Sequence, residues 1–88
     1  MTPKEAIATA KAHISEIFVD EIDYGPKLEE IWFDDEKKEW YITLTVWRKF
    51  YNPSGNPLLT GPSEMKLVRI RDADGRPVAI LNHVPMAF

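Results

Sequence analysis

The sequence predicts an α+β fold in which one N-terminal helix packs on a four-stranded antiparallel β-meander, giving a two-layer sandwich. Residues 3–18 repeat apolar side chains at helical spacing, and four later segments alternate apolar and polar residues with the period of a strand. Turn residues separate these segments, so each strand can run antiparallel to the one before it. With 88 residues, the chain has the length of a single small domain, residues 1–88.

The helix is marked at its start by a capping box, because Thr2 stands at the N-cap and Glu5 follows it by three residues. Pro3 occupies the first helical position, where its missing N–H removes no hydrogen bond. We expect the helix to run from about residue 3 to about residue 18 and to end before Gly25-Pro26. Its apolar stripe consists of Ile7, Ala10, Ile14, Ile17 and Phe18.

The first two strands flank a charged turn, "DDEKKE" at residues 34–39, which we expect to be a solvated hairpin tip. In "LEEIWF", residues 28–33, alternation places Trp32 on one face and its two apolar neighbours on the other. The second strand, "WYITLTVWRKFY" at residues 40–51, is rich in the β-branched and aromatic residues that a pleated sheet favours.

The last two strands are "EMKLVRIRD", residues 64–72, and "RPVAILNH", residues 76–83. They meet in the turn "DADG", with Gly75 at the position that needs a positive φ. Pro77 cannot donate to a strand ladder, which places the last strand at an edge of the sheet. We expect the helix to bury one face of the sheet, formed by Trp40, Ile42, Leu44, Val46, Val68, Ile70, Val78 and Ile80.

A long Pro/Gly-rich loop, "FYNPSGNPLLTGPSE" at residues 50–64, separates the second and third strands. It carries two adjacent leucines, Leu58 and Leu59. We expect these leucines to help cover apolar side chains of the sheet. The covering surface can belong to the chain's own loop, to a second copy of the chain or to another protein.

Composition and charge exclude several classes of function. The chain has no cysteine, which excludes disulfides, thiolate metal sites and cysteine nucleophiles. No apolar run reaches the roughly 20 residues of a membrane span and no basic, then apolar leader opens the sequence, so we expect a cytoplasmic protein. The net charge is −3, divided into −6 over residues 1–39 and +3 over residues 40–88. A net acidic chain is a poor candidate for binding nucleic acid.

The residues that could carry chemistry lack the partners that chemistry needs. His13 and His83 are the only histidines, and no carboxylates stand at ligand spacing beside them. Asp72 and Asp74 resemble a fragment of a calcium loop, but His83 occupies the position of its closing glutamate. The serines have neither a neighbouring base nor a glycine-rich elbow. We therefore expect no catalytic residue, no metal and no cofactor, and the chain is not expected to be an enzyme.

A single helix can cover only one face of the predicted sheet. The reverse face would carry aromatic and basic side chains of the types enriched in binding hot spots, where open antiparallel faces are normally polar. Its members are Trp32, Tyr41, Thr43, Thr45, Trp47, Met65, Leu67, Arg69 and Arg71. Equally, the loop of residues 50–64 could fold back over this face and close a second small core with Leu58 and Leu59.

These observations predict a non-enzymatic protein-interaction module that acts through this face and the adjoining loop, with a homodimer as its simplest form. Tyr41 and Trp47 would anchor the partner together with Trp32. Arg69 and Arg71 would orient an acidic partner, and Leu58 and Leu59 would gate or extend the contact. The alternative is an immunity or inhibitor protein that blocks a toxin or a peptidase.

A third hypothesis is weak binding of single-stranded nucleic acid, because basic residues interleave with aromatic ones that could stack on bases. The overall negative charge opposes it. The basic residues are Arg48, Lys49, Lys66, Arg69, Arg71 and Arg76.

The motifs "TPKEAIATAKAHI", "WYITLTV" and "KLVRIRDADGRPVAIL" together resemble a PepSY-type module. Such modules have a helix followed by an antiparallel sheet, with a Trp-led strand and a final hairpin that turns at Asp-x-x-Gly. The resemblance implies a small non-catalytic module that inhibits or regulates a partner protein, often a peptidase. The chain departs from the pattern in its loop of residues 50–64 and in showing no export signal, although most PepSY modules are extracytoplasmic. Small bacterial immunity proteins resemble this layout to a similar degree.

Overall fold

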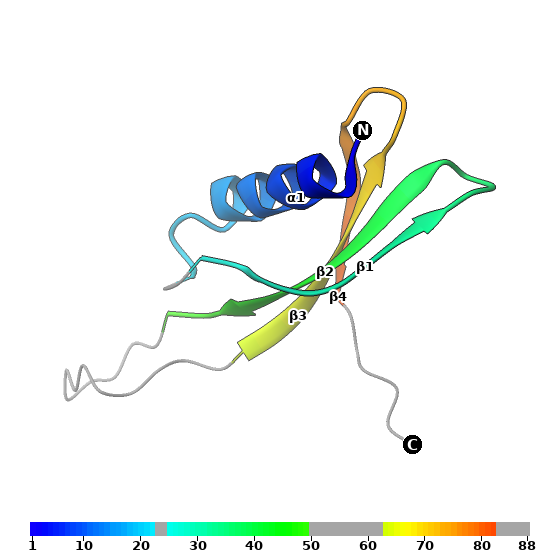
Figure 1. Ribbon diagram of the computed structural model, residues 1–88. Coiled ribbons are helices and arrows are strands. Elements are labelled where there is room, and N and C mark those ends of the chain that lie inside the picture. Colours follow the sequence, from blue (N-terminus) through cyan, green and yellow to red (C-terminus); the bar gives the residue numbers. More distant parts are fainter. Residues whose placement is uncertain (23–24, 50–62, 83–88) are drawn as a thin grey trace, which may run out of the picture.

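The computed structural model describes residues 1–22, 25–49 and 63–82 (Figure 1). The elements follow in the order α1 (Pro3–Ile17), β1 (Lys27–Asp34), β2 (Glu39–Trp47), β3 (Ser63–Arg71) and β4 (Pro77–Asn82). The four strands form one sheet in the order β1-β2-β3-β4, and every neighbouring pair is antiparallel. Because α1 lies on one face of this sheet, the predicted α+β sandwich is confirmed.

Helix α1 begins as the sequence predicts. The Thr2 hydroxyl accepts a hydrogen bond from the Glu5 N–H at 3.1 Å, and the Glu5 carboxylate accepts one from the Thr2 N–H at 2.9 Å. Both bonds satisfy N–H groups that the first turn of a helix leaves without backbone partners. The buried stripe is Ala6, Ala10 and Ile14.

The predicted burial of Ile17 is wrong, since its side chain is 52% exposed. Ile17 ends the helix, and the sheet below the last turn offers charged rather than apolar side chains. Arg48 and Lys66 reach the neighbouring Phe18 there, with Arg48 Cζ at 5.1 Å and Lys66 Nζ at 5.5 Å from the centre of its ring.

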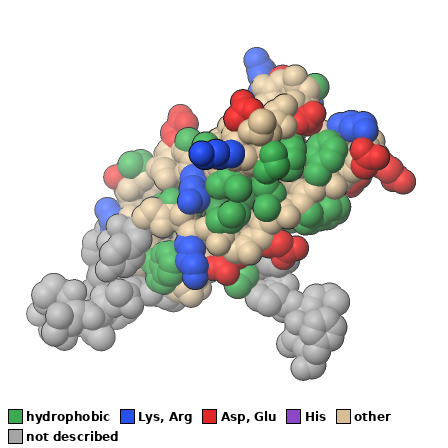
Figure 2. Space-filling model, in the orientation of Figure 1, with side chains coloured by type: hydrophobic (Ala, Val, Ile, Leu, Met, Phe, Trp, Pro, Cys, Tyr) green, Lys and Arg blue, Asp and Glu red, His purple; other side chains and the backbone are tan. Residues whose placement is uncertain are grey.

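The core lies between α1 and the two central strands. Ile42, Leu44 and Val46 of β2 and Val68 and Ile70 of β3 are fully buried against the helix, as predicted. Partly buried side chains complete this layer: Phe18, Ile22, Leu28, Ile31, Trp40 and Ile80. Figure 2 shows hydrophobic side chains gathered at the surface between α1 and the β1–β2 hairpin, so the core reaches solvent on this side of the sandwich.

Val78 was predicted in this core but is 39% exposed, so that prediction is wrong. The reason is a shift of register between β3 and β4. Arg69 stands opposite Ala79, whereas Ile70 stands opposite Pro77, and Val78 is the extra residue between them. A bulge of this kind breaks the strict alternation of faces on which the prediction depended.

The turns and edges follow the predicted chemistry. Gly75 has a φ of +66°, the left-handed conformation that glycine adopts without steric cost, and Pro77 opens the edge strand β4. Strand β3 begins at Ser63, so the last two residues of the range 50–64 belong to the strand. The rest of that loop, with Leu58 and Leu59, lies outside the described residues. Among the described residues, no helix is long and apolar enough to cross a bilayer.

Candidate functional site: the uncovered sheet face

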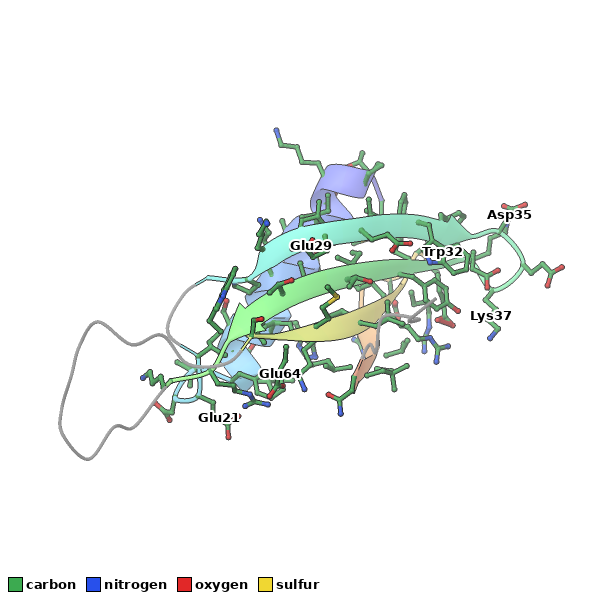
Figure 3. All side chains as sticks on the ribbon, turned by 90° about the horizontal axis from the view of Figure 1, so that it is seen from below. Glu21, Glu29, Trp32, Asp35, Lys37 and Glu64 are labelled. Carbon is green, nitrogen blue, oxygen red and sulfur yellow. The ribbon has the colours of Figure 1, made fainter. Side chains whose placement is uncertain are left out.

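The face of the sheet opposite α1 carries the side chains that the sequence predicted for it. We call it the uncovered face. Figure 3 looks onto this face, with α1 behind the sheet and Trp32 over β1. The register places the odd-numbered residues of β2 beside the odd-numbered residues of β3, and Trp32 beside Tyr41. The face consists of Lys27, Glu30, Trp32, Asp34, Glu39, Tyr41, Thr43, Thr45, Trp47, Ser63, Met65, Leu67, Arg69, Arg71, Ala79 and Leu81.

Three of these side chains form a stacked row across three strands. The rings of Trp32 and Tyr41 lie 4.5 Å apart at an angle of 9°, and the guanidinium carbon of Arg69 lies 5.7 Å from the centre of the Tyr41 ring. Cross-strand aromatic pairs and cation–π contacts of this kind stabilise a sheet and fix ring orientations. Trp32 is nevertheless 50% exposed. The row therefore presents a rigid, half-exposed indole to solvent.

Arg69 is held by the chain's own carboxylate. Its Nε and Nη2 donate to the two oxygens of Glu39, each at 2.9 Å, and these bonds raise the pKa of Arg69 above its ordinary value. A bidentate pair of this geometry is among the stronger hydrogen-bonded ion pairs. An incoming carboxylate would have to compete with Glu39, so the main role of Arg69 is to hold the Tyr41 ring in place.

Arg71 is more open to a partner. Its only ion pair in the described part of the chain is with Asp74, three residues on, at 3.1 Å, and its side chain is exposed. Solvent-exposed pairs of this type contribute little and exchange readily. Of the two arginines predicted to orient an acidic partner, Arg71 is therefore the one that can do so without breaking a buried contact.

The rest of the uncovered face is apolar along β3 and β4. Met65 and Leu67 are half-buried, and Leu81 is 46% exposed. On β2, Thr43 and Thr45 are buried between their cross-strand neighbours, and the Thr45 hydroxyl donates to Glu29 Oε1 at 3.0 Å. An antiparallel face that is open to water normally carries polar side chains, so this composition needs an explanation.

Trp47 lies at one end of the uncovered face. It is the last residue of β2, stands opposite Ser63 and is half-buried. Leu58 and Leu59 belong to residues outside the described part of the chain. Their predicted role as a cover for this end of the face stays a prediction.

A second polar cluster, on the helix side of the sheet, was missed by the sequence analysis. Lys66 is buried below Phe18, where its Nζ pairs with Glu64 at 3.1 Å and donates to Asn82 Oδ1. Arg48 binds the same Glu64 at 3.1 Å, and this bond lowers the pKa of the Glu64 carboxyl. The signal was present in the alternation of β3, which puts Lys66 on the same side as Val68.

This cluster corrects the basic patch expected for nucleic acid. Lys66 and Arg48 contact Phe18 on the helix side, so they do not share a face with Tyr41. Arg48 is further occupied by Glu21 at 2.8 Å. The predicted row of basic residues is thus divided between the two faces of the sheet and is largely paired with acids.

The acids of the β3–β4 turn have structural partners. Asp72 accepts a hydrogen bond from the Trp40 indole N–H at 2.9 Å, and its carboxylate lies 3.6 Å from the N-terminal amine of Met1. Asp74 accepts from the Arg76 N–H at 3.1 Å, and this bond lowers the pKa of the Asp74 carboxyl. Within the described ranges, no three His, Asp or Glu side chains are grouped so that they could hold a metal ion.

Comparison with protein-family models, with curated proteins and with solved structures gives no match to this chain. The resemblance to PepSY-type modules therefore stays a prediction.

Proposed function

We propose that this chain is a non-enzymatic, cytoplasmic protein-interaction module that binds another protein through its uncovered sheet face. The observation that carries the proposal is the state of Trp32, whose ring is fixed by stacking on Tyr41 while half of its surface stays exposed. A rigid, exposed indole loses little entropy when a partner buries it, and tryptophan dominates interface energetics.

The charges at the margin of the face favour a partner with an apolar centre and carboxylates around it. Arg71 and Arg76 lie exposed at the end of the sheet formed by the β3–β4 turn, and Lys27 lies exposed on β1. Their acidic neighbours are within the same short segments, Asp74 for the arginines and Glu29 for Lys27 at 3.5 Å. Because exposed pairs of this kind are weak, partner carboxylates can replace the intramolecular ones.

The proposal is tested by affinity capture with matched baits. The wild-type chain, Trp32→Ala and Ile17→Ala are immobilised separately and exposed to a lysate of the cells from which the protein comes. Ile17 is the control because it is exposed to a similar extent, 52% against 50%, but belongs to α1. We expect a partner that is retained by wild type and Ile17→Ala and depleted at least about tenfold by Trp32→Ala, the loss that about 1.4 kcal/mol of binding energy produces.

Equal retention of every captured protein by all three baits would overturn the proposal. If the partner that depends on Trp32 is the chain itself, the uncovered face binds a second copy.

The β1–β2 hairpin favours a second candidate function, that of an immunity or inhibitor protein. This hairpin extends away from the body of the sandwich, and Asp35 and Glu36 lie exposed at its tip (Figure 1). Lys38 pairs with Asp35 at 2.8 Å, so Glu36 is the tip carboxylate that can enter the active site of a toxin or a peptidase that binds basic substrates. For this function, Glu36→Lys should abolish capture of the partner, whereas Trp32→Ala and the control Glu16→Lys, on an exposed site of α1, should not.

A further inference from the structure

The two edges of the sheet differ in how they are protected against pairing with another strand. Both edge strands have a register shift, between Leu28 and Glu30 in β1 and at Val78 in β4, but four of the eight residues of β1 are charged. Bulges and charges are the devices with which proteins prevent edge-to-edge association. The opposite edge strand, β4, has the sequence "PVAILN" with no charged residue.

Strand β4 also exposes much of its apolar surface. Val78 is 39% and Leu81 is 46% exposed, and Ala79 and Ile80 are only partly buried. Among the described residues, β4 pairs with β3 alone, so one row of its backbone N–H and C=O groups has no strand partner. An uncharged, apolar edge with free backbone groups is a template for a further strand.

We infer that β4 is a self-association edge, at which a second copy of this chain pairs antiparallel through its own β4. A second copy suits this edge because pairing of β4 with itself places apolar side chains against apolar ones and leaves no charge to be desolvated. A strand as acidic as β1 would instead place the carboxylates of Glu29 and Glu30 beside Val78 and Ile80. Pro77, which lacks an N–H, stands at the end of β4, where the pair would lose only a marginal hydrogen bond.

The geometry of such a pair determines the assembly. Antiparallel pairing of identical edge strands in one continuous sheet requires a two-fold axis perpendicular to the sheet, and the interface is then isologous. Both copies of α1 fall on the same side, and the two uncovered faces join on the other. Leu67 and Leu81 are neighbours across β3 and β4, so this apolar row would continue into the row of the second copy.

The assembly is expected to be a dimer in exchange with the monomer, because one six-residue strand buries less area than stable interfaces do. This inference is independent of the proposed function. Trp32 lies on β1, at the other edge of the sheet, so variants of Trp32 and of β4 test different surfaces.

The first test is the mass of the protein by sedimentation equilibrium up to about 1 mM, the range that detects weak dimers. We expect the average mass to rise from 10.2 kDa toward twice that value. Leu81→Lys should keep the mass at the monomer value at all concentrations, because it places an ammonium group of each copy within the paired apolar strands. Trp32→Lys, at a site of similar exposure on the far edge, should dimerise like wild type. A wild-type chain that stays monomeric at about 1 mM, or a dimer that survives Leu81→Lys, would overturn the inference.

A second test covers the case in which Leu81→Lys does not fold. The chain has no cysteine, so single cysteines can be placed at residues 78 to 81 one at a time and oxidised with air. A disulfide needs Cα atoms roughly 4.4–6.8 Å apart, which only positions next to a two-fold axis provide. We expect cross-linking to peak at one position of β4 and to fall on both sides. Yields that are uniform along β4, or no higher than that of Trp32→Cys on β1, would show that β4 does not pair with itself.

Discussion

Replacing Trp32 by alanine should remove the proposed binding anchor and leave the protein folded. Truncating a core residue of the same sheet should instead destabilise the fold strongly. The two side chains that make this comparison are Trp32, half exposed on the uncovered face, and Leu44, fully buried against α1. If the uncovered face is open in the free protein, the two substitutions differ sharply in their cost.

The magnitudes follow from burial. Complete burial of a large apolar side chain contributes about 3 kcal/mol at the upper end of its range. Because half of Trp32 stays exposed, Trp32→Ala should lower the free energy of unfolding by about 1.5 kcal/mol, with the lost stack on Tyr41 included. Leu44→Ala also leaves a cavity and should cost about 3–4 kcal/mol.

The assay is urea denaturation followed by far-UV circular dichroism, because tryptophan fluorescence itself changes in the Trp32 variant. Both variants are compared with wild type at equal and low protein concentration. A loss for Trp32→Ala as large as that for Leu44→Ala would refute the reasoning, since it would mean that the uncovered face is closed in solution. A loss below about 2 kcal/mol with full native ellipticity is the expected result.

Three further predictions concern the contacts that hold the sandwich together. Thr2→Ala removes the capping box of α1 and should lower the free energy of unfolding, measured in urea, by about 1 kcal/mol. Ser15→Ala, at an exposed position of the same helix, is the control. Gly75→Ala forces a side chain into a φ of +66° with its Cβ 2.9 Å from Met1 Cε. It should lower the free energy of unfolding by about 1 kcal/mol, which corresponds to a fall of several degrees in the melting temperature. Glu64→Gln should destabilise the protein by about 1 kcal/mol at pH 7, where Glu64 pairs with Arg48 and Lys66. The folded pKa of Glu64 is lowered, so its stabilisation is present above the ordinary glutamate value of about 4.3 and is lost as the pH falls through the folded pKa. The stabilities of Glu64→Gln and wild type should therefore converge toward low pH in urea titrations, and a constant difference would contradict this pairing.

Local patterns in the sequence were sufficient to predict most of this fold. The capping box gives the start of α1, strict alternation gives the faces of β2 and β3, and Gly75 gives the last turn. The alternation of β1 likewise predicted that Trp32 lies on the other face of the sheet from the core residues of that strand. Each of these features depends on residues close together in the chain.

The errors arose where one element depends on another. The exposure of Val78 follows from a bulge between β3 and β4, and nothing in the alternation of either strand reveals where a bulge will form. Ile17 has the spacing of the buried stripe, but its burial depends on what the sheet offers below the last helical turn. Lys66 was read by its charge as a surface residue, whereas its position in the strand placed it under Phe18 with Glu64 and Asn82 as partners.

The uncovered face could likewise be predicted only as a set of residues. That Glu39 occupies the guanidinium of Arg69 follows from the pairing of β2 with β3, in which Glu39 stands opposite Arg71 and Tyr41 opposite Arg69. This contact changes Arg69 from a free cation into the support of the Tyr41 ring, and it leaves Arg71 as the arginine available to a partner.

The exposure of the Trp32 ring in the free, monomeric protein is the most direct test of the central claim, that α1 shields one face of the sheet only. It can be measured by NMR as the paramagnetic relaxation that a neutral, soluble gadolinium chelate induces in assigned indole signals. Trp40, whose indole N–H is bound to Asp72 on the helix side, provides the internal reference. We expect strong relaxation of the Trp32 ring protons and weak relaxation of those of Trp40. Equal protection of the two rings would contradict the account.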